Sequence, residues 1–262
     1  MMALSPRARA TLGLLGAAAI VALLVAERRR PLRRQTVPAL RRNVRNAAMG
    51  AMCAAVVSAV ETPLTRAVAR ANRRERRGLA HRVASPLSGA VAFLAMDYGF
   101  YLWHIATHRV PFLWRFHRVH HVDPDMDVST AVRFHLVDML VSLPWRLVQV
   151  RVSGITPGAL EAWQGFFTLS IMFHHSNLAL PGRWDERLSL VLTTPRMHGI
   201  HHSVVPAERD SNWSSGISVW DHLHGTFRAI PSQCAIMIGV DDADAAADVA
   251  IAAALRAPFR TR

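Results

Sequence analysis

The sequence contains no lysine and only two cysteines and two tyrosines. All 31 basic side chains are therefore arginines, and against 18 acidic residues they give a formal net charge of +13. The two cysteines, Cys53 and Cys234, fit neither a disulfide framework nor a thiolate metal site. Any metal chemistry in this chain must therefore use other ligands.

The chain also lacks a linker rich in proline, glycine or serine, so its 262 residues predict a single domain. The mean hydropathy of +0.17 is high for a soluble domain and contrasts with the large charge. The two facts agree because apolar segments alternate with arginine-rich runs, at residues 28–45 and 66–82. Such runs are typical of lipid head-group and cytoplasmic-loop contacts. We therefore expect a membrane protein with no nucleic-acid partner.

Three apolar segments are candidates for membrane helices. Residues 10–26 are uncharged and just long enough to cross a hydrocarbon core of roughly 30 Å. A cleaved signal peptide is the alternative there, but the basic run that follows shows no clear cleavage site. Residues 46–60 predict either a span or an interfacial helix. Residues 83–103 are interrupted only by Asp97, which is costly at membrane depth unless paired. We expect Asp97 either to support a histidine or to make a structural hydrogen bond.

Fourteen histidines are present, and most of them fall into spaced motifs. One H-x-x-x-H motif ends the third apolar segment, and two H-x-x-H-H boxes follow. Residues three or four apart share a helix face, whereas adjacent residues diverge by about 100°. Adjacent histidines are therefore not expected to bind the same ion, and the two boxes predict two metals side by side, each box supplying both. These histidines are His104, His108, His117, His120, His121, His198, His201 and His202.

No glutamate lies inside any of the three motifs. A zinc protease of the H-E-x-x-H type needs such a glutamate as its general base. A carboxylate-bridged di-iron bundle would show Glu-x-x-His pairs, and haem would leave most of the histidines unexplained. Imidazole suits iron, zinc, copper and nickel alike, so the ligand type alone does not choose the metal.

The motifs and their order resemble the fatty acid hydroxylase / sterol desaturase superfamily. The resemblance runs from about Asp97 to Arg228, half of the chain, and is highly specific. Two positions depart from the pattern: Ile105 stands where the family often has arginine, and Leu136–Asp138 stands where it usually has proline and then glutamate. The similar segments are Asp97-Tyr98, His104–His108, Trp114–His121, Thr130–His135, His175–Leu178, Thr194–His202, Trp220-Asp221 and Gly225-Thr226.

The resemblance implies an all-α integral membrane enzyme with a cytosolic helical cap. About ten histidines would hold two iron ions (zinc is possible in purified protein). It implies that His135 and His175 complete the eight ligands named above, and it leaves out His174. Dioxygen and two electrons would serve to hydroxylate or desaturate a fatty acyl, sterol or related lipid. His81, His222 and His224 fit no motif and are expected to be ordinary surface or capping residues.

The order of apolar and charged segments predicts how the chain is organised. We expect N-terminal membrane helices and basic loops over residues 1–82 and a catalytic domain over residues 83–262. Residues 139–173 are apolar but broken by charged residues, Gly154 and Pro157, so we expect a hairpin that returns His174 and His175 to the face of His104. The tail from Asp241 should form a small helix. The metals should lie just outside the bilayer, facing the cytoplasm of a bacterial inner membrane. The positive-inside tendency opposes this arrangement, because three spans place Arg66–Arg82 on the far side.

The electron donor should be a separate reductase, ferredoxin or cytochrome, because the sequence has no His-Pro-Gly-Gly haem motif and no cysteine cluster. Two other functions remain open at this stage. A membrane metal-binding or transport protein would need ligands distributed through the bilayer, and a zinc-dependent lipid hydrolase would need a general base.

Overall fold

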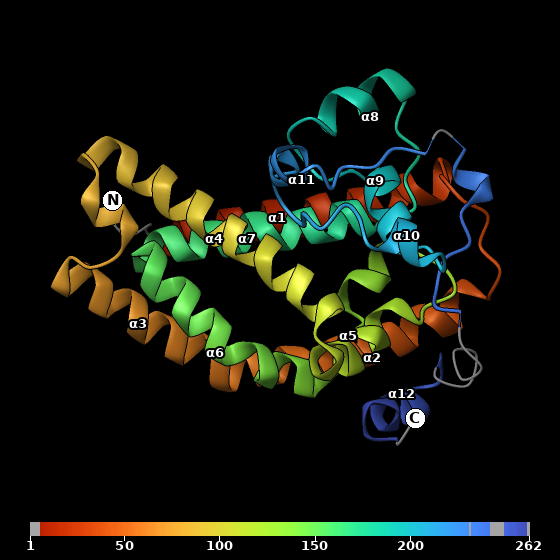
Figure 1. Ribbon diagram of the computed structural model, residues 1–262, viewed down its shortest axis with the longest axis horizontal. Helices are drawn as coiled ribbons and strands as arrows, with labels where there is room; N and C mark the ends of the chain where they lie inside the picture. Colours follow the sequence, from red (N-terminus) through yellow and green to blue (C-terminus); the bar gives the residue numbers. More distant parts are fainter. Residues whose placement is uncertain (1–5, 231, 242–248, 261–262) are drawn as a thin grey trace.

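The computed structural model describes residues 6–230, 232–241 and 249–260. Within these residues the chain is helical, and its only extended pairings are two isolated bridges, Pro31 with Leu178 and Ser203 with Ile238. Figure 1 shows the long helices running along the longest axis of the molecule, with the short helices gathered in one half. The all-α prediction is confirmed.

The helices fall into two classes by length. The long helices are α1 (Pro6–Arg29), α2 (Ala39–Val56), α3 (Thr62–Glu75), α4 (Ser85–Arg109), α6 (Leu136–Ser153) and α7 (Pro157–His175). The short helices are α5 (Pro111–His121), α8 (Gly182–Leu188), α9 (Pro195–His201), α10 (Pro206–Arg209), α11 (Val219–His224) and α12 (Ile251–Arg256). The described residues also contain a π-helix η1 (Val57–Glu61) and the 3-10 turns η2 (Leu79–Arg82), η3 (Val128–Val132), η4 (Gln233–Ala235) and η6 (Ala257–Phe259).

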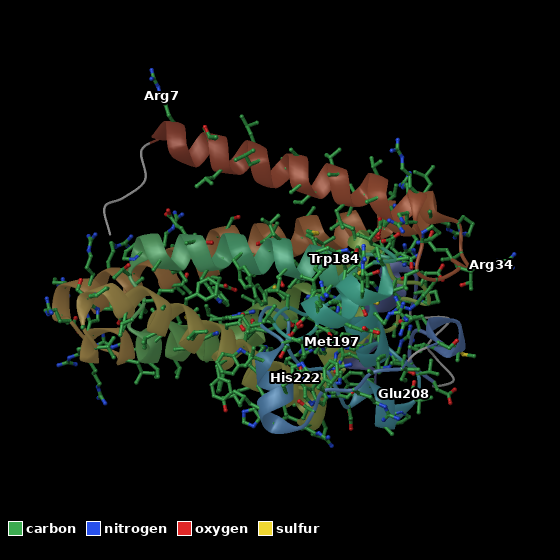
Figure 2. All side chains as sticks on the ribbon, turned by 90° about the horizontal axis from the view of Figure 1, so that it is seen from above. Arg7, Arg34, Trp184, Met197, Glu208 and His222 are labelled. Carbon is green, nitrogen blue, oxygen red and sulfur yellow. The ribbon has the colours of Figure 1, made fainter. Side chains whose placement is uncertain are left out.

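Two helical stretches of the described residues are long and apolar enough to cross a membrane, Ala10–Arg29 and Ala39–Arg82. The first lies in α1, whose leucines point outward, with Leu14 73% exposed. Figure 2 shows Arg7, in the first turn of α1, and Arg34, which follows the helix, toward opposite ends of the molecule. The segment expected at 83–103 becomes α4 but does not meet the same criterion of length and hydropathy.

The prediction of a basic loop over residues 66–82 was wrong for the part that forms α3. Arginine and alanine favour helix, and the chain buries one face of α3 through Thr65, Ala69 and Asn72 while most of its arginines stay exposed. The helix continues from α2 through η1, where the Thr62 N–H donates to the Val57 carbonyl five residues back. Pro63 follows directly. Because proline lacks an N–H and clashes with the preceding turn, a widened turn at this point accommodates it.

Helices α6 and α7 form the expected hairpin over residues 139–173, and its turn is fixed by two glycines. Gly154 ends α6 with a φ of +71°, and Gly78, with a φ of +101°, lies directly against it. A Cβ atom on Gly78 would lie 2.3 Å from the Gly154 Cα atom. Only glycine combines this conformation with this close approach. The hairpin then packs on α3 and α4 around a core that includes Ala92, Met96 and Trp163.

The C-terminal tail, expected to form a small helix, contains α12 and η6 within its described residues. Residues 242–248 and 261–262 of that prediction lie outside the part of the chain that the structure describes. Ala254 of α12 is fully buried in a small cluster with Met49 of α2 and Val119 of α5. The tail therefore packs against the helix that carries the first histidine box.

A buried ionic network joins α2 to the loop that follows the first box. The Arg42 guanidinium is 1% exposed and forms ion pairs with Asp123, at 3.1 Å, and with Asp127. Asp123 also accepts hydrogen bonds from Arg45 and Asn46, each at 2.8 Å. Because Asp123 follows His121 by two residues, the network fixes the end of α5 against α2. The N-terminal region is thus part of the framework that positions the histidines.

We predict that Arg42→Met lowers the free energy of unfolding by about 3–5 kcal/mol, because it leaves the buried Asp127 carboxylate without a counter-charge and Asp123 with Arg45 alone. Denaturant unfolding of the detergent-solubilised protein measures this change. Arg41→Met is the matched control, since Arg41 is exposed on the same helix and should change stability by about 0.5 kcal/mol or less. Equal effects of the two substitutions would show that the network does not stabilise the fold.

Candidate metal centre

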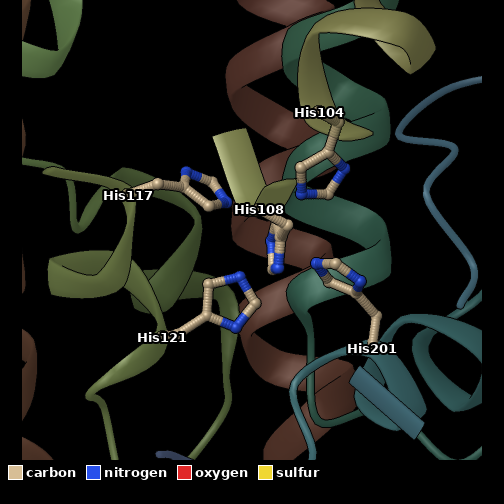
Figure 3. A group of neighbouring side chains, drawn as sticks. All are labelled: His104, His108, His117, His121 and His201. Carbon is tan, nitrogen blue, oxygen red and sulfur yellow. The ribbon is translucent and has the colours of Figure 1, made fainter. Parts of the chain in front are cut away.

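Nine histidines form two adjoining groups, and within each group the candidate ligand atoms all lie within 4.8 Å of one another. Figure 3 shows the first group, whose five rings surround one central point. The groups share a border, since the His121 and His202 rings stack with centroids 4.2 Å apart. The first group is His104, His108, His117, His121 and His201, and the second is His120, His175, His198 and His202.

Helix geometry explains how the residues divide. His104 and His108, four apart on α4, enter the same group, as do His117 and His121 on α5. Adjacent histidines separate: His120 and His121 enter different groups, and so do His201 and His202. This is the division that the roughly 100° angle between consecutive helical residues predicts. Each H-x-x-H-H box therefore contributes to both groups.

The ring nitrogens that face the two centres fit a metal ion. Buried nitrogens of several members have no hydrogen-bond partner within the described part of the chain, among them Nε2 of His108, His117 and His201. In the second group, the Nε2 atom of His175 lies 3.0 Å from that of His120 and 3.1 Å from that of His198. Leaving so many polar atoms unsatisfied in a protein interior is costly. A cation at each centre would accept their lone pairs and remove that cost.

The opposite nitrogens are held by the backbone. The Nδ1–H groups of His104, His175 and His201 donate to the carbonyl oxygens of Trp213, Ile171 and Ser211, at 2.7, 2.7 and 3.0 Å. The Nδ1–H of His120 donates to the Arg133 carbonyl at 3.2 Å. A carbonyl accepts only from a protonated nitrogen, so the lone pair of each ring lies on Nε2. This is the arrangement that orients imidazoles toward a metal.

Burial also keeps the imidazoles neutral. Desolvation lowers the pKa of His201 to about 3, and the neighbouring imidazoles add to the effect. The pKa values of His120, His121, His198 and His202 are likewise lowered well below the usual value, mainly because these rings are buried. At neutral pH the rings therefore carry free lone pairs, the form in which histidine binds metals.

Of the ten histidines proposed from the sequence, the structure brings nine together and places His135 apart. His135 caps α6, where its Nδ1 atom accepts a hydrogen bond from the Val137 N–H at 3.1 Å. Its Nε2–H donates to the Leu255 carbonyl at 3.2 Å. Both nitrogens are thus used by the fold, and His135 belongs to neither group. As the N-cap of α6, His135 turns its ring toward the backbone of that helix and not toward the two histidine groups.

His174 was left out of the sequence prediction, but the structure places it beside the second group. Its ring is fully buried, with centroids 4.0 Å from His198 and 4.5 Å from His175. The sequence did show a second histidine beside His175 at the end of α7, which could have indicated that His174 lies near the site. The family that the sequence resembles often has another residue at this position, so the resemblance gave no reason to assign His174 to the site.

Asp138 is a second residue that the sequence reasoning did not assign. Its carboxylate is buried and lies 3.8 Å from the His117 Nδ1 atom, so it faces the ring from outside the first group. Asp97, in contrast, accepts hydrogen bonds from the Ile217 N–H and the Trp220 Nε1–H. Of the two roles considered for Asp97, these contacts correspond to the structural hydrogen bond. His81, His222 and His224 lie in neither histidine group.

Gly199 lets the third motif approach the N-terminal segment. A Cβ atom at this position would overlap the Arg33 guanidinium, 1.6 Å from its Nη2 atom. The same Nη2 atom donates to the Pro195 carbonyl at 3.1 Å, which holds the start of α9. Gly199, within the second H-x-x-H-H box, is therefore the residue against which the loop after α1 packs.

A cavity of about 460 Å³ opens beside both groups, between α2, α4, α6 and α7. Members of both groups, including His117 and His175, line one end of it. Apolar and aromatic side chains such as Phe100, Trp103, Phe134 and Phe167 cover most of its wall. The cavity thus offers an apolar organic molecule direct access to the candidate metal sites.

The family model for fatty acid hydroxylases matches residues 89–226, more than half of the chain. The chain belongs to the fatty acid hydroxylase family. The matched segment contains all nine clustered histidines, with helices α5, α7 and α9 and most of α4, which carry them. The family and the two candidate membrane stretches together indicate a membrane-associated protein.

Curated relatives within the family are lipid hydroxylases and monooxygenases, which are oxidoreductases. The chain is 32% identical over 145 residues to the ornithine lipid hydroxylase OlsE of Rhizobium tropici, covering 55% of this chain and 43% of that protein. It is 30% identical to the human alkylglycerol monooxygenase, covering 55% and 32%. It is 27% identical to the human cholesterol 25-hydroxylase, covering 52% and 49%. The chain thus spans a third to a half of these relatives' lengths. No solved structure matches it.

We predict that the two groups can be emptied separately. His108→Ala removes a ligand of the first group only and His175→Ala one of the second group only, so each should lower the metal content from two ions toward one. Elemental analysis of the purified, membrane-extracted protein measures this ratio. His81→Ala is the control and should retain both ions. A wild-type protein that is well folded yet holds no metal would contradict the assignment.

We also predict that the metal-free protein loses stability as the pH falls from 7 toward 3. The buried imidazoles have pKa values below 6.5, so the unfolded chain binds protons that the folded chain does not. The free energy of unfolding therefore decreases as the pH decreases, by up to about 1.4 kcal/mol per pH unit for each such histidine. Thermal unfolding of chelator-treated protein at pH 7 and pH 5 tests this. His201→Asn should reduce the dependence, and a stability that does not change with pH would exclude the buried neutral state.

Proposed function

We propose that this chain is a membrane oxygenase that uses two iron ions, dioxygen and electrons from a separate protein to hydroxylate a lipid. The observation that carries the proposal is the pair of all-histidine groups opening on one end of an apolar cavity. The relatives named above support the lipid class of the substrate. Desaturation of the same chain is the other outcome that this chemistry allows.

The ligands of the two irons would be the nine clustered histidines, with His174 beside them. The bound irons would activate dioxygen toward a C–H bond, chemistry that no side chain of the protein can perform alone. Neither group contains a carboxylate, so nothing within them would serve as the general base of a hydrolase. The protein's own contribution is to hold the imidazoles neutral and oriented and to shape the cavity.

Three features of the chain perform that task. The backbone carbonyls at Trp213 and Ser211 fix the rings of His104 and His201. The Asp138 carboxylate faces the outer nitrogen of His117 and would hold a proton there. The aromatic wall of the cavity excludes water and places one carbon of the substrate beside the histidines.

The membrane is the proposed source of the substrate. The apolar part of α1 and residues 46–60 of α2 and η1 would lie in the bilayer, and α2 and η1 contribute Cys53, Ala54 and Val57 to the cavity wall. A lipid tail would therefore pass from the bilayer into the cavity without crossing water. We propose a bacterial inner membrane and a cytoplasmic metal centre, because the reaction needs electrons from a reductase, ferredoxin or cytochrome.

We expect one atom of dioxygen to appear as a hydroxyl group on a long-chain lipid. The iron-loaded protein is incubated with ¹⁸O-labelled dioxygen, a reductase system and native membrane lipids, and the lipids are analysed by mass spectrometry. Label in a hydroxyl group supports hydroxylation, whereas loss of two hydrogens without label supports desaturation. His121→Ala, which should be inactive, is the control for uncatalysed oxidation. Products labelled only from water would mean that the site performs hydrolysis.

A further inference from the structure

The end of the cavity that lies away from the histidines carries two opposite charges. Arg146 of α6 and Glu61 of η1 both line it, together with Gln164 of α7. Arg146 lies eight residues beyond Asp138 on α6, which corresponds to about 12 Å along the helix. Glu61 lies eleven residues beyond Gly50, and Gln164 eleven residues before His175, or about 16 Å in each case. The two charged residues are therefore displaced along their helices from the histidine-lined part of the same cavity.

These two charges are not neutralised by each other or by the surrounding protein. Within the described residues, neither side chain takes part in an ion pair, and the Arg146 Nε atom is buried without a hydrogen-bond partner. The guanidinium lies over the Phe100 ring, 4.8 Å from its centroid, which leaves its N–H groups available. The other charges of this region pair among themselves, Arg66 with Glu161 and Arg151 with Glu75.

Such charges are unusual on the wall of a cavity that is otherwise mostly apolar. Glu61 directly follows the uncharged run 46–60 of α2 and η1, and Arg146 lies within the apolar helix α6. The π-helix turns the chain at this point, and π-turns within longer helices are frequent at functional sites. A cavity that received only a hydrocarbon tail would need neither charge. Asp138, the other acid on the wall, lies at the metal end beside His117.

We propose that this end of the cavity binds the head group of a zwitterionic amphiphile, with its cationic part against Glu61 and its acidic part against Arg146. A purely anionic head group would face the Glu61 carboxylate, and a purely cationic one would face the Arg146 guanidinium. Only a head group that carries both charges satisfies both side chains. The inference rests on the proposed lipid-oxygenase function and names its substrate class. It also places the oxidised carbon in the chain, remote from the head group.

The test measures binding and needs no turnover. The full-length protein is held in the neutral detergent dodecyl maltoside and titrated with four 8-bromooctyl probes whose head groups are phosphocholine, phosphate, trimethylammonium and hydroxyl. The terminal bromine quenches the fluorescence of nearby tryptophans, and both Trp103, which precedes His104, and Trp163, which precedes Gln164, line the cavity. Trp103→Phe should therefore lower the quenching more than Trp163→Phe does, which locates the end of the bound chain beside the histidines.

The wild type should bind the phosphocholine probe about tenfold more tightly than each of the other three, since one satisfied charged hydrogen bond is worth that factor. Glu61→Gln should abolish the preference over the phosphate probe, and Arg146→Met the preference over the trimethylammonium probe. The matched controls Glu186→Gln and Arg183→Met replace exposed charges of the cap and should leave the ranking unchanged. Free phosphocholine without a chain should not displace the probe.

Equal binding of all four probes by the wild type would overturn the proposal. So would an unchanged ranking in both variants accompanied by a lower melting temperature, because Glu61 and Arg146 would then serve only the fold. Displacement by free phosphocholine would show that a small solute, not an amphiphile, is bound. None of these outcomes depends on dioxygen or reductant, so a protein that binds the zwitterion but oxidises nothing would contradict the proposed function alone.

Discussion

The structure depends on one constraint, which is that the lone pairs of many neutral imidazoles must be buried and must point at two neighbouring centres. Imidazole has two nitrogens, and a ring has a defined donor and acceptor only when one of them is fixed. Here backbone carbonyls fix Nδ1 in His104, His120, His175 and His201. The carbonyls come from loops and from a helix turn, so the irregular segments of the cap are as important to the site as the helices.

This constraint also explains why the buried ionic network lies where it does. The first box ends at His121, and the chain immediately enters the loop that contains Asp123, Asp125 and Asp127. Arg42 and the backbone N–H groups of Thr36 and Val37 satisfy these carboxylates. The N-terminal segment thus supports the box from outside while Arg33 supports the second box at Gly199. The N-terminal region, which the sequence predicts to be membrane helices and basic loops, is therefore also part of the scaffold of the site.

The histidine spacing was enough to predict the two groups, because the angle between successive helical residues is a local property of the chain. The hairpin of α6 and α7 followed from the positions of Gly154 and Pro157 in an apolar run. His135 could not be placed in this way. Its role depends on whether the ring turns toward the cavity or back to the Val137 N–H, a choice made by tertiary packing against Leu255. The same limit applies to α3, because its arginines are compatible with a loop and only the structure shows that the opposite face of the helix is buried. It also applies to Asp138, because its neighbour His117 is distant in sequence.

The sharing of each box between both groups has a mechanical consequence. Helices α5 and α9 are far apart in the chain, and between them lies the whole α6–α7 hairpin. An ion held by His121 and His201, and another held by His120 and His202, would each close that long loop as a disulfide closes one. Two ions that link α5 to α9 side by side would prevent the two helices from rotating about each other as well as from separating. The helices that carry the histidines would then form a rigid unit. The cavity between α2, α4, α6 and α7 would keep one shape while it binds substrates of different length.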